Sequence, residues 1–176
     1  MGMVPRYIPH YTVEDYQLWE GRWELWSGVP VAMSPSADRL HQRTSGRLFQ
    51  RLDEALRVAG CSCCEALYEI DWVAAEDTVF RPDLLVACDE GTSRFITQAP
   101  ALVVEILSPS TRSKDLLYKR EAYEGLGVAY YLIVDPEARQ WSLLVREEGR
   151  FVECREARLH LHRDCQIELS LDGLFE

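Results

Sequence analysis

Two stretches of the chain carry apolar residues at the spacing of an amphipathic helix. In residues 36–59, leucines and alanines recur at helical intervals, and Gly60 is a natural stop. In residues 110–127, Ser113 is a candidate N-cap and a glycine follows the last apolar position. The apolar stripe of this second helix consists of Leu116, Leu117, Tyr123 and Leu126. A shorter helix is expected over residues 13–19, because Thr12 is a capping residue and acids follow it.

Strand patterns begin with residues 22–34, which alternate around the turn dipeptide at Ser27 and Gly28. This alternation predicts a hairpin with Glu24 on its first strand. Residues 64–75 and 78–90 are each expected to form one strand, with an acidic turn between them.

A further strand is expected over residues 103–108, and three more within residues 128–159, joined by turns at Asp135-Pro136 and Glu148-Gly149. The sum is an α+β (or α/β) fold, in which a mixed β-sheet is flanked by two main helices. Because 176 residues suffice for one hydrophobic core but not comfortably for two, we expect residues 1–176 to form a single domain.

One carboxylate stands inside an apolar run. Glu105 lies near the end of "ALVVEILSPS", residues 101–110, whose composition is typical of a strand covered on both faces. Burying an unpaired carboxylate there would cost several kcal/mol. It must be compensated by a basic side chain, by a raised pKa that neutralises it, or by a metal ion.

A second acid is expected beside it. Asp83 begins the apolar run "PDLLVAC", and in an antiparallel pair the start of this strand lies beside the end of the Glu105 strand. Two carboxylates within about 4 to 6 Å share a proton or bind a cation, and a hard ion such as Mg²⁺ or Mn²⁺ suits oxygen ligands. The main-chain carbonyl of Ile106 is a candidate further ligand. This donor set is typical of metal-assisted phosphodiester hydrolysis, in which a nearby lysine orients water or offsets charge.

Composition limits the partners. The chain is 47% hydrophobic and 27% charged, which is ordinary for a globular protein. Its 19 basic and 29 acidic residues give a net charge of −10, which argues against an abundant, non-specific nucleic-acid binder. An enzyme that holds a metal among carboxylates remains compatible with this charge.

The chain has no apolar run of membrane-spanning length and no apolar segment of a signal peptide at its N-terminus, so we expect no membrane partner and a cytoplasmic location. In a reducing compartment the six cysteines would be free thiols. Cys61 to Cys64, "CSCC", is their only cluster, and it has no companion C-x-x-C or nearby histidine. A structural zinc site is therefore not predicted there.

The order and spacing of several motifs resemble the Uma-two family of endonucleases, within the PD-(D/E)XK nuclease superfamily. The resemblance covers nearly the whole chain and implies a restriction-endonuclease-like core, a Mg²⁺-dependent site and a nucleic-acid substrate, with DNA the first choice. The motifs are "RWELWSG", "HQRTSGRLFQRL", "RPDLLVA", "LVVEILSPSTRSKD" and "YKREAYEGLGVAYYLIVDP".

The resemblance implies roles for four residues. Asp83 matches the aspartate of the "PD" element and Glu105 matches the acid of the "(D/E)XK" element. Two positions after that acid the superfamily has a lysine, whereas this chain has Leu107, which cannot activate water. The family implies that the lysine function has moved to Lys119 on the following helix. Glu24 matches an upstream glutamate that often completes the metal site.

Each assignment has a structural alternative. Asp83 follows a proline and is also an ordinary turn residue. Glu105 is alternatively one half of a buried ion pair with Lys119 or Arg120. Lys119 is alternatively paired with Asp115, four residues earlier, on the helix surface.

The remaining polar and aromatic candidates are weaker. Glu24 is alternatively an ordinary polar strand residue that faces Arg22 or a residue of a neighbouring strand. His41, alone on its helix, is more typical of a surface or core residue than of a ligand. Tyr118 and Tyr123 are expected to pack in the core.

The turn before the second main helix offers a possible anion site. The hydroxyls of residues 108–111 and the Arg112 guanidinium could contact phosphate there, and a helix N-terminus favours anions. The expected role of these residues is nevertheless only to form the turn and cap.

Three functions remain open at this point. The first is a metal-dependent endonuclease. The second is an inactive nuclease-fold module for binding or assembly, suggested by Leu107 and the acidic charge. The third is a phosphodiesterase for a small nucleotide, which an acidic surface tolerates better than a duplex. Five tryptophans and several candidate exposed strands are compatible with a homodimer, a common assembly of soluble chains.

Overall fold

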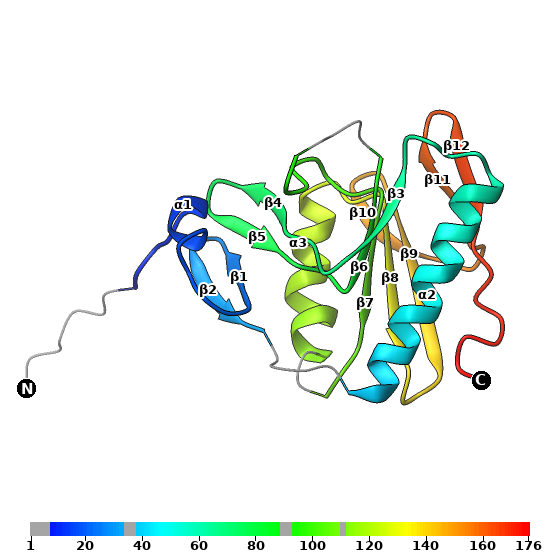
Figure 1. Ribbon diagram of the computed structural model, residues 1–176, viewed down its shortest axis with the longest axis horizontal. Coiled ribbons are helices and arrows are strands. Elements are labelled where there is room, and N and C mark those ends of the chain that lie inside the picture. Colours follow the sequence, from blue (N-terminus) through cyan, green and yellow to red (C-terminus); the bar gives the residue numbers. More distant parts are fainter. Residues whose placement is uncertain (1–7, 34–37, 89–92, 110–111) are drawn as a thin grey trace, which may run out of the picture.

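A mixed six-stranded sheet forms the centre of the protein (Figure 1). The computed structural model describes residues 8–33, 38–88, 93–109 and 112–176. The sheet has the order β10-β9-β8-β7-β6-β3, in which only β7 and β8 are parallel. Its strands are β3 (Glu65–Tyr68), β6 (Leu84–Ala87), β7 (Leu102–Ile106), β8 (Tyr130–Asp135), β9 (Gln140–Glu147) and β10 (Arg150–Cys154).

Helices cover both faces of this sheet (Figure 1). The long helix α2 (Arg39–Val58) packs on one face, where alternate strand residues such as Leu84 and Val104 meet its leucines. The helix α3 (Arg120–Gly125), which continues a π-helical segment η1 (Lys114–Lys119), packs Tyr123 on the other face. A parallel pair of strands needs such a crossover, and η1 and α3 supply it between β7 and β8. The predicted α+β fold, with a mixed sheet flanked by two main helices, is confirmed.

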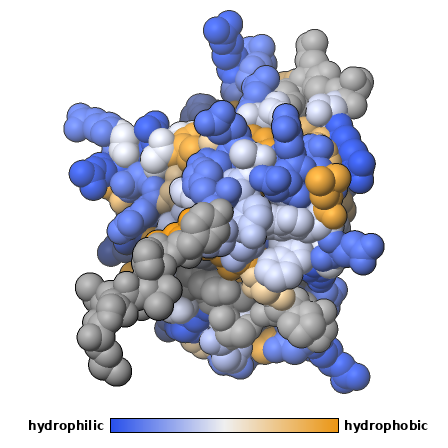
Figure 2. All heavy atoms as spheres, turned by 90° about the vertical axis from the view of Figure 1, so that its left-hand side faces the viewer, coloured by the Kyte–Doolittle hydropathy of each residue, from blue (hydrophilic) through white to orange (hydrophobic). Residues whose placement is uncertain are grey.

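A smaller sheet holds the N-terminal part of the chain. It has the order β2-β1-β5-β4, and α1 (Val13–Tyr16), with its capping box between Thr12 and Asp15, packs against it. Its strands are β1 (Trp23–Trp26), β2 (Val29–Ala32), β4 (Trp72–Ala75) and β5 (Thr78–Phe80). The predicted hairpin is confirmed, with positive φ at both Ser27 (46°) and Gly28 (79°), as a tight two-residue turn requires. The face on the side of α1 is largely hydrophilic where its residues are coloured (Figure 2).

The prediction of single strands over residues 64–75 and 78–90 was wrong. Each stretch forms two strands, one in each sheet, because the chain bends at Glu69, where φ is 38°, and at Pro82. Proline has no N–H to continue a ladder. Just before it, the Arg81 N–H donates to the Glu24 carboxylate. The bend thus brings the start of β6 close to β1.

The second main helix also departs from its prediction. The first part, residues 114–119, is π-helical, Ser113 makes no side-chain capping hydrogen bond, and Leu117 is 67% exposed instead of buried. A π-helix has i→i+5 hydrogen bonds, so its wider turns shift the apolar stripe relative to an α-helix. Residues 110–111 of the predicted helix, and residues 36–37 of the first, lie outside the described residues.

The C-terminal part contains a hairpin that the pattern did not predict. It consists of β11 (Arg158–His162) and β12 (Cys165–Glu168), whose alternate residues are buried against the α2 face of the central sheet. Disulfides join Cys61 to Cys165 and Cys64 to Cys88, so the expectation of six free thiols was wrong for these four. Two cysteines remain free among the described residues, at positions 63 and 154. No helix in the described parts of the chain is long and apolar enough to cross a membrane.

Candidate active site

Charged side chains from three elements meet near the end of β7. Glu105 comes from β7, Glu24 from β1, and Asp115 and Lys119 from η1. All four are buried, with exposures between 2% and 5%. Because charged residues are almost never fully buried unless they are paired, their mutual contacts determine what this cluster can do.

Lys119 lies between the three acids. Its Nζ donates to Oε1 of Glu105 at 2.8 Å and lies 3.1 Å from Oε1 of Glu24 and 3.7 Å from Oδ1 of Asp115. The buried ion pair between Glu105 and Lys119 is therefore present. The pair with Asp115 is present too, but it is buried and does not lie on the helix surface as its structural alternative supposed. A basic side chain thus compensates Glu105.

The π-helical geometry of η1 explains how Lys119 reaches the sheet. Asp115 and Lys119 face inward, whereas Leu117 is 67% exposed and Tyr118 is 38% exposed. π-helical turns frequently occur at functional sites. Here Asp115 and Lys119 of one segment contact each other in the protein interior, and Lys119 also contacts Glu105.

Three further donors complete the surroundings of the two glutamates. The Tyr123 hydroxyl donates to Oε1 of Glu105 at 2.7 Å. The Arg81 N–H and the Trp26 indole N–H donate to Glu24 at 2.8 and 3.2 Å. Tyr123 is fully buried, so its expected core position is confirmed, yet its hydroxyl also contacts this cluster. Glu24 does not face Arg22, which pairs instead with exposed Glu69 at the bend after β3.

The excess of carboxylates over cations sets the electrostatics. Burial raises the pKa of Glu105 well above its usual value; Lys119 lowers it, while Asp115, Asp83 and Glu24 raise it further. Burial lowers the pKa of Lys119, but the attraction of its three carboxylates is stronger and raises that pKa well above its usual value. Lys119 is therefore protonated at neutral pH, and the carboxylates around it hold excess negative charge.

Asp83 lies directly beside this cluster. The strands β6 and β7 are antiparallel, with Leu84 opposite Val104, so the predicted pairing of these strands is confirmed. The Asp83 carboxylate accepts the Ile106 N–H at 2.7 Å and lies 3.2 Å from Nε2 of His41. It is near enough to Glu105 to raise the pKa of that residue. Asp83 and Glu105 therefore lie at the same end of β6 and β7, and their charges interact.

His41 connects this end of the sheet to a pocket. Burial lowers the pKa of His41, but its hydrogen bond to Asp83 and the charge of that carboxylate raise it above the usual value. The histidine is 8% exposed, and its Nδ1 has no hydrogen-bond partner. A pocket of about 290 Å³ opens here, lined by His41, Gln42, Ser45, Gly46, Tyr68, Glu69 and Asp83.

The other candidates lie elsewhere. Leu107 is buried among apolar side chains on the α3 face. Tyr118 does not lie in the core as expected; its ring stacks on Trp26 with centroids 4.4 Å apart. Arg112 pairs with Asp135 at 2.6 Å. Of the predicted turn, residues 110–111 lie outside the described residues.

Sequence reasoning gave two members of the site no functional role. Asp115 was regarded only as a surface partner of Lys119, and Tyr123 only as a core residue. Their spacing of four residues on either side of Lys119 is the signal that could have identified them. In the described parts of the chain, with both disulfides closed, no group of three or more His, Cys, Asp and Glu side chains is arranged to hold a metal ion.

Comparisons with known proteins identify the family and the fold. The sequence matches the family model Uma2, described as "Putative restriction endonuclease", over residues 13–173. The fold is similar to the crystal structure of "a putative nuclease belonging to DUF820" from Anabaena variabilis ATCC 29413. That similarity has a TM-score of 0.72 at 15% identity and covers 94% of this chain and 97% of the other. No curated protein matches the sequence.

Proposed function

The chain belongs to the Uma2 family of restriction-endonuclease-like proteins, and from this premise we propose that it is a metal-dependent endonuclease that hydrolyses phosphodiester bonds of nucleic acid. The substrate proposed first is DNA, and residues 1–176 form the nuclease-like domain. One observation carries the proposal: Lys119 lies 2.8 Å from Glu105 at the end of β7, where Asp83 also lies. A lysine function that has moved from position 107 can therefore reach this acid.

The carboxylate oxygens here are the ligand type that a hard divalent cation prefers, and we propose that they rearrange around the ion, because the described side chains do not form a metal site as they lie. Asp83, Glu105 and Glu24 offer carboxylate oxygens, which Mg²⁺ and Mn²⁺ prefer, and the Ile106 carbonyl stays a predicted further ligand. With all groups ionised, Glu24, Glu105 and Asp115 carry three negative charges against the single positive charge of Lys119. When bound, such an ion supplies charge stabilisation to a reacting phosphoryl group.

The protein's own residues supply the other parts of the reaction. Lys119, kept protonated by its acids, is positioned to offset negative charge that develops on a phosphate oxygen. Asp115 and Tyr123 position Lys119 and Glu105 through their contacts at 3.7 and 2.7 Å. His41 holds Asp83 from the pocket side, and the contact with this carboxylate raises the pKa of His41.

Local positive charge favours approach of a polyanion to this pocket despite the net charge of −10. Arg39 and Arg43 are exposed near the N-terminus of α2, on the helix that carries His41, Ser45 and Gly46 to the pocket wall. A helix N-terminus adds its partial positive charge at the same place. We propose that the phosphate backbone enters along this end of α2.

The inactive binding or assembly module remains the second candidate. The observation that favours it is the saturation of Glu105 and Glu24 by Lys119, Tyr123 and main-chain donors, which leaves the carboxylates paired without any metal. If these contacts do not open to admit a metal ion, the protein serves as a binding or assembly module and does not cleave nucleic acid.

A cleavage assay separates the two candidates. The full chain is incubated with circular DNA, linear DNA, RNA and dinucleotides in Mg²⁺ or Mn²⁺, and products are resolved by electrophoresis. We expect metal-dependent cleavage that is abolished by Glu105→Gln and Asp83→Asn and retained by Glu121→Gln, an exposed glutamate on α3. Absence of cleavage by folded protein on every substrate supports the inactive module, and cleavage of dinucleotides alone supports the small-nucleotide phosphodiesterase.

The location and the assembly stay predictions. Disulfides are typical of oxidising compartments, whereas the sequence favours the cytoplasm, so counting the thiols of freshly isolated protein tests the location. Light scattering of the purified chain tests the predicted homodimer.

A further inference from the structure

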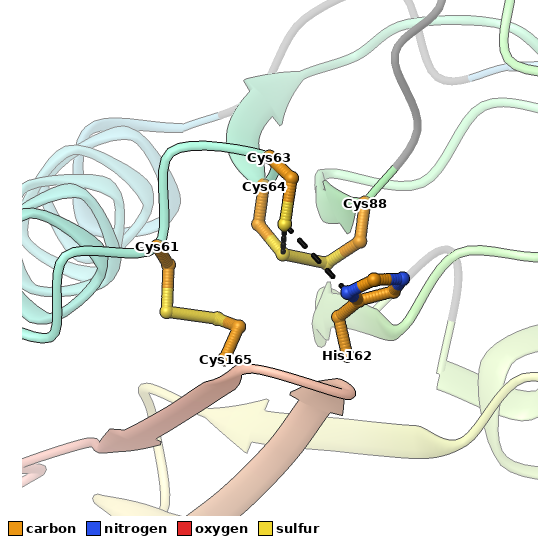
Figure 3. Close-up of a disulfide and its surroundings, with 6 residues drawn as sticks. All are labelled: Cys61, Cys63, Cys64, Cys88, His162 and Cys165. Atoms are coloured by element: carbon orange, nitrogen blue, oxygen red, sulfur yellow. Dashed lines mark hydrogen bonds between the residues drawn. A yellow bond between two sulfur atoms is a disulfide. The ribbon is translucent and has the colours of Figure 1, made fainter.

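A second cluster of reactive side chains lies away from the candidate active site. Figure 3 shows five cysteines and one histidine together, from the loop after α2, the end of β6 and the β11–β12 hairpin. Asp83 precedes β6 and Cys88 follows it, so the two clusters lie at opposite ends of the same strand. The members are Cys61, Cys63, Cys64, Cys88, His162 and Cys165.

The free thiol of Cys63 is central to this cluster. Its Sγ lies 3.8 Å from Sγ of Cys64 and 3.8 Å from Nδ1 of His162. In a tetrahedral zinc site, Zn–S bonds of about 2.3 Å and Zn–N bonds of about 2.0–2.1 Å imply S···S edges of about 3.8 Å and S···N edges of about 3.5 Å. The two distances from the Cys63 sulfur are therefore already close to the separations between zinc ligands.

Cys88 is the fourth group. It is bonded to Cys64, and their Cα atoms are 4.0 Å apart. The adjacent residues Glu65 and Ala87 are directly paired between β3 and β6, so the sheet holds these backbones together whether or not the sulfurs are bonded. Reduction would thus leave two thiols side by side, next to Cys63 and His162.

We propose that the chain with a reduced Cys64–Cys88 pair binds one Zn²⁺ through Cys63, Cys64, Cys88 and His162. A thiol-class reductant opens the disulfide: two reductant thiols lose two electrons and join in a disulfide, and each cysteine sulfur gains one electron and one proton. Zn²⁺ then displaces one proton from each of the three thiols, and neutral His162 binds through Nδ1. A Cys₃His set is typical of structural zinc sites.

The surroundings suit such a site. A pocket of about 240 Å³ is lined by both Cys88 and His162 and gives an ion a path to the sulfurs. Buried Leu159, Leu161 and Ile167 anchor the β11–β12 hairpin, which carries His162, on the core independently of the Cys61–Cys165 disulfide. The bound ion would join the hairpin to the edge of the central sheet.

Exchange between Cys63 and the Cys64–Cys88 disulfide is the competing reaction, and the geometry disfavours it. Attack of Cys63 on its near sulfur would form a disulfide between chain neighbours, which closes a small, strained ring. Chelation requires no new bond between these sulfurs. The 3.8 Å contacts therefore favour a metal site over an exchange site.

Zinc binding is measured on the full chain, isolated in a phosphine reductant and dialysed free of metal. Titration with Zn²⁺ is followed by competition with a chromogenic chelator, and titration with Co²⁺ by its thiolate charge-transfer absorption. We expect one equivalent bound per chain, and a loss of affinity of at least about tenfold in His162→Gln and in Cys63→Ser. Two matched controls, His160→Gln on the same strand and Cys154→Ser at the other free cysteine, should bind like the parent chain.

Circular dichroism is recorded in parallel. If the reduced chain folds only when Zn²⁺ is present, the site is supported, because such coupling of folding to metal is typical of structural zinc. The proposal is overturned if the reduced chain binds no Zn²⁺, if it unfolds with or without the ion, or if the His162 and Cys63 variants bind as tightly as the controls. Peptide mapping that finds Cys63 itself in a disulfide would favour exchange and also overturn it.

Discussion

Replacement of Lys119 by methionine tests the buried charge cluster. The substitution keeps most of the side-chain volume but removes the ammonium that contacts Glu105, Glu24 and Asp115 at 2.8, 3.1 and 3.7 Å. Three carboxylates, each less than 5% exposed, would then face one another without a cation.

The expected magnitude follows from these contacts. An ion pair at about 4 Å contributes about 4 kcal/mol of attraction at an effective dielectric constant of about 20. The free-energy cost of removing the charges from water offsets most of the attraction summed over the three pairs. Removal of one partner from a buried pair destabilises by about 3–5 kcal/mol, because uncompensated charge stays buried. We therefore expect Lys119→Met to lower the free energy of unfolding by about this amount at neutral pH.

The loss should depend on pH. The pKa of Glu105 is raised in the folded chain, so its contribution to stability is present at low pH and is lost as pH rises through the raised value. Without Lys119, which lowers that pKa, the carboxyl holds its proton to still higher pH. The variant should therefore lose less stability at about pH 5 than at about pH 8.

Urea unfolding followed by tryptophan fluorescence measures both effects. The matched control is Arg120→Met, which removes an exposed cation from the next position and should change stability by less than about 0.5 kcal/mol. A loss below about 1 kcal/mol in Lys119→Met, equal at the two pH values, would refute the reasoning.

Three other substitutions test separate contacts. Tyr123→Phe removes a donor to the Glu105 carboxylate and should cost about 1.5–3 kcal/mol in urea unfolding. Asp83 raises the pKa of His41, so the stability that this pair adds is present below about pH 6.5 and is lost as pH rises. His41→Gln should therefore destabilise the protein more at about pH 6 than at about pH 8.5 in the same assay. An equal loss at both pH values would argue against the pair. Cys165→Ser removes a disulfide that spans 104 residues and should lower stability by about 2–5 kcal/mol, measured by thermal unfolding against Cys154→Ser.

The shared position of Asp83 and Glu105 at one end of the sheet was predictable because it depends on short-range rules. Antiparallel pairing of neighbouring apolar runs places the start of one strand beside the end of the next. For the buried charge of Glu105, the sequence predicted only three alternatives: a basic partner, a raised pKa or a metal ion. The structure combines two of them, a basic partner and a raised pKa.

Other features depend on contacts that a local pattern does not contain. Residues 78–90 divide at Pro82, which is a local signal, but the placement of the two strands in different sheets involves distant contacts, such as the hydrogen bond from the Arg81 N–H to Glu24, 57 positions earlier. The π-helical segment changes which side chains face inward, and apolar spacing at α-helical intervals does not reveal it. The C-x-C-C cluster showed no nearby histidine because His162 reaches it from a hairpin 99 residues later.

The most direct test of the nuclease proposal is anomalous X-ray scattering from a crystal of the chain soaked in Mn²⁺. The proposal predicts an anomalous peak between the carboxylates of Asp83 and Glu105, within coordination distance of both, with Glu24 or the Ile106 carbonyl beside it. Peaks at surface acids alone, with Lys119 still hydrogen-bonded to an unmetallated Glu105, would contradict it.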